Sequence, residues 1–251
     1  MHMQLNELNH YLTQLLQPER FNDYCPNGLQ VEGRHEVKKV VTGVTASLAL
    51  LQRAQAANAD VILVHHGYFW KGESQSVTGI KMRRLKFLLE NDLNLFAYHL
   101  PLDAHPEIGN NVMLGKVLGL EIAGWLDSEK NMIAWAELKQ AKSFQAVADE
   151  LSVKLNREVQ LIGDVNKPVH TIAWCTGAAQ GYIDQAIAAN IDVFVSGEIS
   201  EQTVHQVRES NTAYIAAGHH ATERYGIKAL GENLADKFDF QHEFIDINNP
   251  V

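Results

Sequence analysis

Short apolar runs alternate along this chain with segments in which apolar residues recur every three or four positions. The opening segment, residues 4–16, shows this helical spacing in its leucines and stops before Pro18. Further helices are expected at residues 47–57, 80–91, 143–155, 182–190, 201–209 and 222–237. Strands are expected at the apolar runs 40–44, 61–64, 95–98, 133–138, 159–162, 171–174, 193–195, 213–216 and 242–245. This alternation predicts an α/β fold.

Two stretches of this pattern resemble each other at a spacing of 132 residues. Residues 40–66 read VVTGVTASLALLQRAQAANADVILVHH, and residues 172–198 read IAWCTGAAQGYIDQAIAANIDVFVSGE. Each reads as strand, turn, helix, the motif AAN-x-DV and a second strand. We interpret the match as an internal duplication, with a first α/β half at residues 1–126 and a second at residues 127–251.

The similarity continues further along both halves at a spacing of 120 residues. LFAYHLPLD aligns there with IAAGHHATE, so that His99 falls on His219 and Asp103 falls on Glu223. In both halves these polar residues follow an apolar run. Because ligands of open α/β sheets bind outside the carboxyl ends of the strands, we expect the functional site there.

Composition narrows the possible settings and partners of the protein. The chain has 251 residues and a net charge of −9, which disfavours a nucleic-acid or anionic-membrane surface but leaves a small anionic substrate possible. It contains no apolar run of about 18 residues, so no membrane span is expected. We also expect no signal peptide. Cys25 and Cys175 form no CxxC pair, which favours a reducing, cytoplasmic setting.

Histidines are the unusual feature of the composition, with twelve in the chain. His65 and His66 end an apolar run, and Gly67 allows the backbone to bend directly after them. His219 and Glu223 are four residues apart, so they lie on one helical face if a helix begins near His219. Each pair alone also has an ordinary explanation, as a strand end with one solvated ring or as a carboxylate at a helix start.

A third group, His99 and Asp103, has the same four-residue spacing with Pro101 between its members. Proline breaks the interior of a helix, so we predict a loop at HLPLDAHPE, with the carboxylate positioned by a turn.

The candidate ligands together outnumber those of a single tetrahedral zinc site. Imidazoles and carboxylates in this number suit two ions about 3.5–4 Å apart with one carboxylate bridging them. The donor types fit Zn, Mn, Fe, Co or Ni. The expected ligands of two divalent ions per subunit are His65, His66, Asp103, His219 and Glu223.

Six stretches of the chain resemble the YbgI-like, or Nif-three-like, family of dinuclear metal proteins, which are also called GTP cyclohydrolase I type 2 homologues. The resemblance covers essentially the whole sequence and is carried by DYCPNGLQVEG, VTGVTAS, VHHGYFWKG, YHLPLDAHPEIGNN, SGEISEQTVHQ and AAGHHATERYGIKAL. It implies two similar, intertwined α/β halves, a dinuclear metal site in the cleft between them and homohexameric rings. The family ligands fall on the five residues named above, with Glu223 bridging.

With this ligand set, the residues around the ligands can be given roles. His99 then reads as a residue that orients Asp103 or a water, with direct ligation as the alternative. Glu198 is a candidate general base, or else an anchor for its loop. The loop from Tyr68 to Lys71 is either a wall of the substrate pocket or a contact between subunits.

Three classes of function are compatible with such a site. The first is a metal-dependent hydrolase; the resemblance implies hydroxide attack on a purine nucleotide such as GTP, although the chain has no GxxxxGK[ST] phosphate loop. The second is a metal-handling protein that delivers or stores ions without turnover. The third, a ring that binds nucleic acid, is disfavoured by the net charge.

Overall fold

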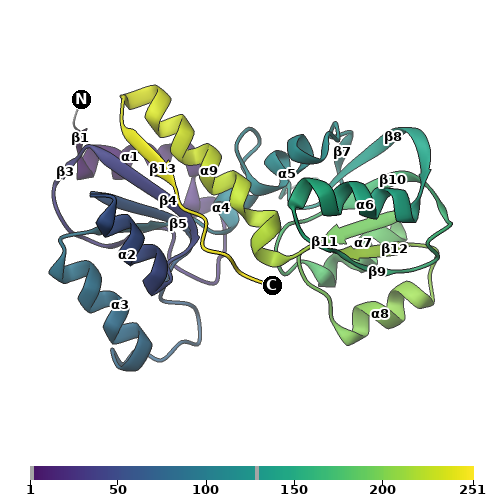
Figure 1. Cartoon of the computed structure of the whole chain (residues 1–251), viewed down its shortest axis with the longest axis horizontal. Helices are drawn as coiled ribbons and strands as arrows, with labels where there is room; N and C mark the ends of the chain where they lie inside the picture. The colour runs from purple at the N-terminus through teal and green to yellow at the C-terminus, as the bar shows by residue number, and fades with distance from the viewer. Residues whose placement is uncertain (1–2, 128–129) are drawn as a thin grey trace. The chain divides into compact units, whose positions relative to one another are not determined.

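The computed structural model describes residues 3–127 and 130–251, which form two compact units. The first unit runs to Leu102 and resumes over Ile227–Asn248. The second contains Asp103–Gly226 and the terminal Asn249–Val251. Both units combine a sheet with helices, which confirms the predicted α/β class (Figure 1).

Among the described residues, the first unit is built on a five-stranded sheet with the order β13-β4-β5-β6-β2. Strands β13, β4, β5 and β6 run parallel, and β2 pairs antiparallel with β6 at the edge. The central strands read as continuous apolar runs because both of their faces are covered. The strands are β2 (Gly28–Val31), β4 (Lys39–Thr45), β5 (Val61–His66), β6 (Asn94–Ala97) and β13 (Gln241–Phe244).

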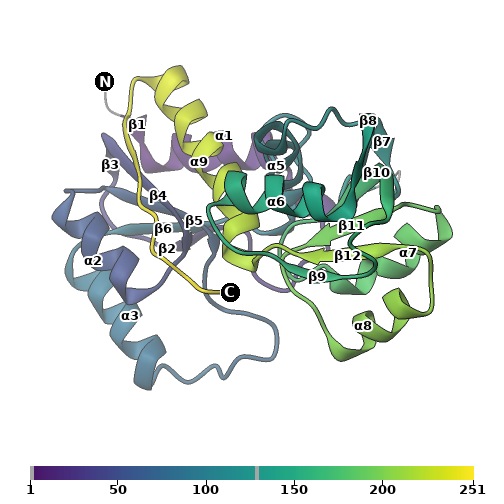
Figure 2. The same ribbon diagram turned by 45° about the vertical axis from the view of Figure 1, so that its right-hand side comes forward.

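Helices cover both faces of this sheet (Figures 1 and 2). On one face, α2 and α3 bury Leu50 and Leu88 in a cluster with Ile62 of the sheet. On the other, the ring of Tyr11 in α1 meets that of Phe238, near the end of α9, at 4.8 Å between centroids. The elements are β1 (Met3–Gln4), α1 (Leu5–Leu16), η1 (Pro18–Arg20), β3 (Glu36–Val37), α2 (Leu48–Ala56), α3 (Gly79–Glu90), α4 (Leu100–Asp103) and α9 (His219–Phe238), of which α9 belongs to this unit from Ile227 on.

The second unit, over its described residues, has a six-stranded sheet with the order β7-β8-β10-β11-β12-β9. Strands β10, β11 and β12 are parallel, and the outer strands join them antiparallel. Apolar residues of α5 and α6 form one core cluster with this sheet. The elements are α5 (Asn110–Leu118), β7 (Gly124–Trp125), β8 (Ala134–Ser143), α6 (Phe144–Leu155), β9 (Gln160–Ile162), β10 (Pro168–Trp174), η2 (Gln180–Tyr182), α7 (Ile183–Ala188), β11 (Val193–Ser196), α8 (Glu201–Arg208) and β12 (Ala213–Ala216).

The repeated motif AAN-x-DV has the same local structure in both units. Asn58 and Asn190 end their helices in the left-handed conformation, with φ of 58° and 54°. Two residues later, a carboxylate oxygen of Asp60 accepts the backbone N–H groups of Lys38 and Lys39, at 2.8 and 2.9 Å. In the second unit Asp192 accepts the N–H groups of the residues 132 positions further on, His170 and Thr171, at 2.8 and 3.1 Å. The shared motif therefore stops a helix and fastens the start of the preceding strand.

The later similarity, at a spacing of 120 residues, differs from the strand register by one residue. Val64 lies opposite Ala97 in the first sheet, and the corresponding Ser196 lies opposite Ala216 in the second. This register relates Ala97 to Ala216, a spacing of 119 residues. His99 and His219 therefore do not occupy equivalent positions after their strands.

The two units also have different bounds from the halves expected at 1–126 and 127–251. Residues 103–126 belong to the second unit, where Leu114 and Leu118 join the core cluster. Residues 227–248 return to the first unit, because β13 pairs in parallel with β4.

Two differences from the predicted elements lie at the candidate ligands. Strand β5 continues through His66, where it pairs with Thr45 of β4. The segment predicted as a loop contains the short helix α4, whose second residue is Pro101; the first turn of a helix tolerates proline. Within the described residues, no helix is both long enough and apolar enough to cross a membrane.

Candidate metal centre

His65 lies near the end of β5 and is completely buried. Its Nδ1 lies 2.9 Å from the backbone oxygen of Tyr98. A carbonyl oxygen can only accept a hydrogen bond, so Nδ1 of His65 carries the proton, and the lone pair of the neutral ring is on Nε2. Metal-binding histidines usually have their second nitrogen fixed in this way.

His66, the last residue of β5, is partly exposed and lies beside His65. Its Nδ1 lies 3.2 Å from Oγ1 of Thr45, and the two histidine rings are 4.5 Å apart at an angle of 44°. Regular pleating would send adjacent side chains to opposite faces. Here the ladder with β6 ends at Val64, so the last two residues of β5 lie outside it.

Gly67 follows β5 directly, at a point where the side chain of Gln30 approaches the backbone closely. A Cβ on Gly67 would lie 2.2 Å from Oε1 of Gln30, which accepts the backbone N–H of Tyr68. Only glycine allows this close approach. The glycine therefore fixes the backbone directly after the two histidines.

His99 follows β6 and lies close to both histidines of β5. Its ring is 5.2 Å from that of His65 and 5.7 Å from that of His66. Nδ1 of His99 lies 2.7 Å from Oδ1 of Asp23. One ring nitrogen from each of the three histidines lies within 4.8 Å of the others, so they could hold a metal ion.

Asp23 was not singled out from the sequence, although it opens the quoted motif DYCPNGLQVEG. Its side chain is 3 % exposed and also accepts bonds from the N–H groups of Tyr24 and Leu100 and from the amide of Asn27. Burial raises the pKa of Asp23, but the hydrogen bonds from His99 and Asn27 outweigh it, and the pKa lies below its usual value. Asp23 therefore stays ionised, and its carboxylate holds the ring of His99 in place.

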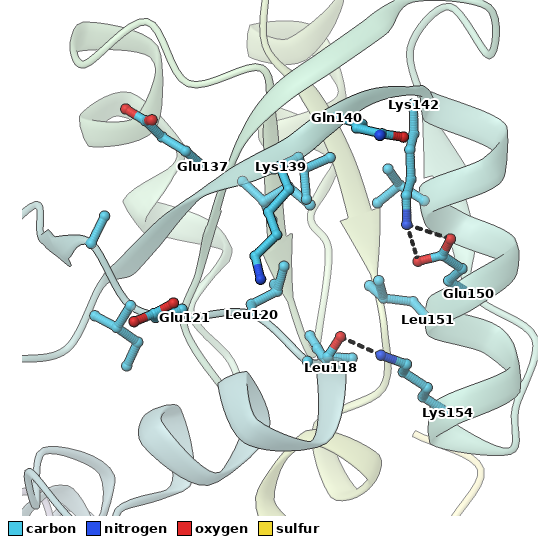
Figure 3. A pocket seen from close by; sticks show the side chains of 16 residues that line it. Leu118, Leu120, Glu121, Glu137, Lys139, Gln140, Lys142, Glu150, Leu151 and Lys154 are labelled. Carbon is cyan, nitrogen blue, oxygen red and sulfur yellow. Dashed lines mark hydrogen bonds and ion pairs between the residues drawn. The ribbon is translucent and has the colours of Figure 1, made fainter.

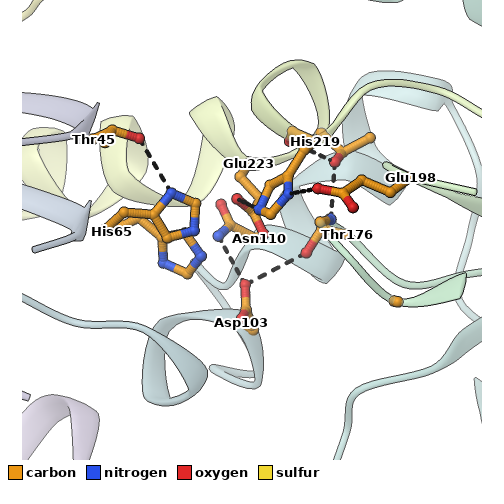
Figure 4. Close-up of polar contacts among 12 residues, drawn as sticks. Thr45, His65, Asp103, Asn110, Thr176, Glu198, His219 and Glu223 are labelled. Atoms are coloured by element: carbon orange, nitrogen blue, oxygen red, sulfur yellow. Dashed lines mark hydrogen bonds and ion pairs between the residues drawn. The ribbon is translucent and has the colours of Figure 1, made fainter. Parts of the chain in front are cut away.

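His219 is the first residue of α9, in the second unit, and lies between two carboxylates. Its Nδ1 is 2.6 Å from Oε1 of Glu198, and its Nε2 is 3.0 Å from Oε2 of Glu223 (Figure 4). Burial lowers the pKa of His219, but Glu223 and Glu198 outweigh burial and raise the pKa to about 9. A divalent ion bound at Nε2 would replace the proton between His219 and Glu223.

The remaining predicted ligand, Asp103, is 5 % exposed and is fixed by neutral donors. Its Oδ1 accepts the amide of Asn110 at 2.9 Å and the hydroxyl of Thr176 at 3.4 Å (Figure 4). Oδ1 of Asn110 accepts the N–H of Gly226 in α9 at 2.9 Å. Asn110 thus connects Asp103 to the helix that carries Glu223. This role was not predicted, although Asn110 lies in the GNN at the end of the motif YHLPLDAHPEIGNN.

Gly177 leaves room for the carboxylate of Glu223. A Cβ at position 177 would lie 2.0 Å from Oε1 of Glu223 and 3.2 Å from Nε2 of His219. The φ of Gly177 is +69°, a conformation that favours glycine. Because Glu223 is 3 % exposed, this glycine decides where the buried carboxylate can lie.

These donor sets fit divalent metal ions. The first unit offers the imidazoles of His65 and His99 and the second that of His219, each oriented by an acceptor on Nδ1, and the second unit adds two buried carboxylates. Neutral imidazole and carboxylate together suit Zn, Mn, Fe, Co and Ni. Each of the five predicted ligands, His65, His66, Asp103, His219 and Glu223, belongs to a group of donor atoms that could hold a metal ion. Glu198 forms a hydrogen bond with the ring of His219.

The loop after Gly67 has mixed roles. Tyr68 is buried, and its hydroxyl donates to the backbone oxygen of Ala46 at 2.7 Å, so it supports the fold. Trp70 lies at 5.0 Å from the ring of His99, edge to face. Lys71 is exposed.

A hollow of about 1020 Å³ lies elsewhere in the second unit (Figure 3). It forms where β8 departs from β10, between the pairs Glu137–Thr171 and Lys142–Val169. Lys142 pairs there with Glu150 across the rim. None of the predicted ligands lines this hollow.

Comparison with known proteins places the chain in a family. The model of the family Duf34/NIF3 (NGG1p interacting factor 3) matches residues 3–250. A Pseudomonas aeruginosa protein named GTP cyclohydrolase 1 type 2 homolog is 55 % identical over 238 residues, which cover 94 % of each chain. A solved structure of the protein ybgI, described as of unknown function, has a TM-score of 0.95 at 47 % identity and covers 99 % of this chain and 100 % of its own. The structure of TTHA1606 from Thermus thermophilus has a TM-score of 0.89 at 34 % identity, covering 99 % of this chain and 100 % of its own. The chain therefore belongs to the Duf34/NIF3 family.

Proposed function

We propose that this protein binds two divalent metal ions per subunit and uses them to hydrolyse a small anionic substrate. The proposed ligands are His65, His66, Asp103, His219 and Glu223, with Glu223 bridging. The observation that carries the proposal is the bonding of His219, whose Nδ1 meets Glu198 and whose Nε2 meets Glu223. Metal-binding imidazoles usually donate their second N–H to a carboxylate or carbonyl, as Nδ1 of His219 does to Glu198, and Glu223 adds a carboxylate beside the other nitrogen.

The residues around these ligands have defined tasks in such a centre. Glu198 holds the ring of His219 in one orientation, and its charge makes the ring a stronger donor. Asn110 and Thr176 direct one oxygen of Asp103, while Gly177 leaves space for Glu223. When bound, a pair of divalent ions would supply an activated water, with its pKa lowered to about 7, and would polarise the substrate.

A recess beside Glu198 contains the guanidinium of Arg157 together with the carboxylates of Glu158 and Glu198. It has a volume of about 370 Å³ and its lining includes Arg157, Gly197, Glu198 and Gly218. Nη1 of Arg157 lies over Gly218, where it would be 2.0 Å from an added Cβ. Gly218 precedes His219 directly, so the guanidinium is positioned to bind a phosphate or carboxylate of a substrate near the proposed metal ligand.

The relatives named GTP cyclohydrolase 1 type 2 homolog make a purine nucleotide the first substrate to test. The full chain is loaded with Mn, Zn, Fe, Co or Ni, its metal content is measured, and GTP is followed by absorbance beside a panel of phosphoesters. We expect turnover that depends on two bound ions and is abolished by a chelator. Full occupancy without turnover of any substrate would contradict the hydrolase.

That negative result would favour the second candidate, a metal-handling protein. The side chain of His219 keeps 25 % exposure, which gives an ion a route to exchange. Rapid transfer of bound metal to an apo acceptor would support this function, and slow exchange would count against it. The homohexameric ring, proposed from the family resemblance, is tested by light scattering of the same preparations.

A further inference from the structure

Two aromatic side chains of the first unit, Tyr24 and Trp70, lie beside the histidines of the candidate metal centre. The ring of Trp70 is 5.0 Å from that of His99 and 6.0 Å from that of His66. The ring of Tyr24 is 6.4 Å from that of His99. Tyr24 is nevertheless 61 % exposed and Trp70 is partly exposed, so both side chains present ring surface to a ligand.

The two loops that carry these rings are tied to each other by hydrogen bonds. The side chain of Gln30 accepts the backbone N–H of Tyr68 at 2.7 Å and donates to the backbone oxygens of Tyr68 and Pro26, at 3.1 and 2.8 Å. The backbone N–H of Lys71 donates to the backbone oxygen of Tyr24 at 2.6 Å. Side chains on loops fixed in this way lose less conformational entropy when they bind a ligand.

The position of Trp70 is fixed by its own contacts and by the residue before it. The indole N–H donates to the backbone oxygen of Gly67, and the backbone N–H donates to Glu73, both at 3.2 Å. Phe69 has a φ of +65°, a conformation that is rare for a bulky side chain. Such strain persists only where the surroundings hold it, and it concentrates at functional sites. The loop therefore maintains Trp70 in one place at the cost of a strained backbone.

Exposed aromatic side chains on a fixed backbone are the usual means by which proteins bind nucleobases. The base stacks on the side chain, and the stacking tolerates different bases because every base has a flat face. A phosphate group has no such face and gains nothing from these rings. A ligand that uses Tyr24 and Trp70 therefore carries a flat heteroaromatic ring.

We infer that Tyr24 and Trp70, here called the aromatic platform, bind the ring of the substrate by stacking. The inference rests on the proposed function and names the substrate class of the same site. The substrate is then an anion that carries a heteroaromatic ring, such as a nucleotide, rather than a simple phosphoester.

The test compares ligands that share a phosphoribose and differ in the presence of a base. Calorimetry on the full chain loaded with metal measures Kd for GMP, AMP and ribose 5-phosphate. The wild type should bind both nucleotides about 5–100-fold more tightly than ribose 5-phosphate. Y24A and W70A should each reduce this preference by about fivefold or more, without changing the Kd for ribose 5-phosphate.

Two further variants separate the ring from the loss of surface. Y24F keeps the ring and should bind nucleotides like the wild type. V77A, at an apolar residue that is 52 % exposed in the same unit, is the matched control and should have no effect. If W70A does not fold by circular dichroism, Y24A decides alone, because the side chain of Tyr24 is mostly in solvent.

The outcomes separate the aromatic platform from the proposed function. Equal Kd values of the wild type for nucleotides and ribose 5-phosphate, or unchanged nucleotide binding in Y24A, would overturn the platform. A Y24A variant with a smaller mass in light scattering and unchanged nucleotide binding would assign the ring to a contact between subunits, which also overturns it. Full metal occupancy with no preference for nucleotides refutes the platform alone. A chain that binds no metal but prefers nucleotides refutes the proposed function alone.

Discussion

The carboxylate of Glu198 accepts a hydrogen bond from Nδ1 of His219 at 2.6 Å. Replacing Glu198 by alanine removes both the acceptor and its charge, so the ring of His219 loses its fixed orientation. We expect metal affinity to fall by about 10–100-fold in E198A. E198Q keeps an acceptor oxygen and should lose less. Competition with a chelator measures both, with E137A, at an exposed glutamate of β8, as the control.

An unchanged affinity in E198A would show that Glu198 does not support a metal-binding His219. Equal losses in E198A and E198Q would instead assign the effect to the charge alone.

Removal of a proposed ligand should separate metal binding from folding. In H66A or E223A we expect loss of bound metal, measured by elemental analysis after gel filtration, with the circular dichroism spectrum retained. His66 is partly exposed, so its truncation leaves a small cavity at most. If either variant kept both ions, the five-residue ligand set would be wrong.

Gly177 gives a prediction about space rather than charge. In G177A the new Cβ would meet Oε1 of Glu223 at 2.0 Å, and alanine would also have to adopt a φ of +69°. We expect the free energy of unfolding to fall by about 1–3 kcal/mol and metal binding to weaken as Glu223 is displaced.

The neighbouring G181A variant is the matched control for G177A. A Cβ on Gly181 meets nothing within 4 Å. Thermal unfolding and metal titration should therefore leave G181A close to the wild type. Wild-type behaviour of G177A would contradict the tight packing of glycine against Glu223.

The parallel strands of both units could be predicted because buried parallel strands carry uninterrupted apolar runs. The predicted strand at residues 213–216 coincides with β12, and the helix predicted at 143–155 differs from α6 by one residue. Edge elements were harder: β2 and β7 are short and pair on one side, so their sequences carry little apolar pattern. Helix α5 was not predicted. Both polar and apolar residues are buried in its first turns, so its sequence lacks a clear apolar stripe.

The candidate site was only partly visible in the sequence for a different reason. Histidines stand out in a sequence because they are common metal ligands. The residues that hold them by hydrogen bonds are ordinary polar residues, distant along the chain. Asp23 reaches His99 across 76 positions, and Asn110 reaches Gly226 across 116. The predicted equivalence of His99 and His219 was wrong by one residue. The sequence similarity has a spacing of 120 residues, whereas the strand registers relate the two sheets at a spacing of 119.

Asp192 should make a pH-dependent contribution to stability. Burial raises the pKa of Asp192, but bonds from the N–H groups of His170 and Thr171 and the charge of Lys167 outweigh it and lower the pKa. A carboxyl whose folded pKa is depressed stabilises the protein above its unfolded pKa of about 3.9, and the contribution is lost as the pH falls through the folded pKa.

We therefore expect D192N to lower the free energy of unfolding by about 1–2 kcal/mol at pH 7, with the difference from wild type shrinking below about pH 4. Urea unfolding at both pH values measures it. D236N, at an exposed carboxylate of α9, is the control and should differ little from wild type at either pH. A difference that grew on acidification would contradict the assigned direction of the pKa.

Arg157 tests whether the recess beside Glu198 binds the anionic part of a substrate. The guanidinium is held by the backbone oxygen of Pro250 at 3.0 Å and lies over Gly218. Replacing it by glutamine keeps a polar side chain but removes the charge, so R157Q should raise KM for an anionic substrate by about tenfold or more. Metal content and kcat should stay close to wild type, because Arg157 is not a proposed metal ligand. R208Q, at an exposed arginine of α8, controls for the loss of one positive charge from the surface.

Where turnover is slow, calorimetric Kd values for a nucleoside triphosphate give the same comparison. Equal KM or Kd values for R157Q and R208Q would remove the recess from the proposed site and leave anion binding to the metal ions alone.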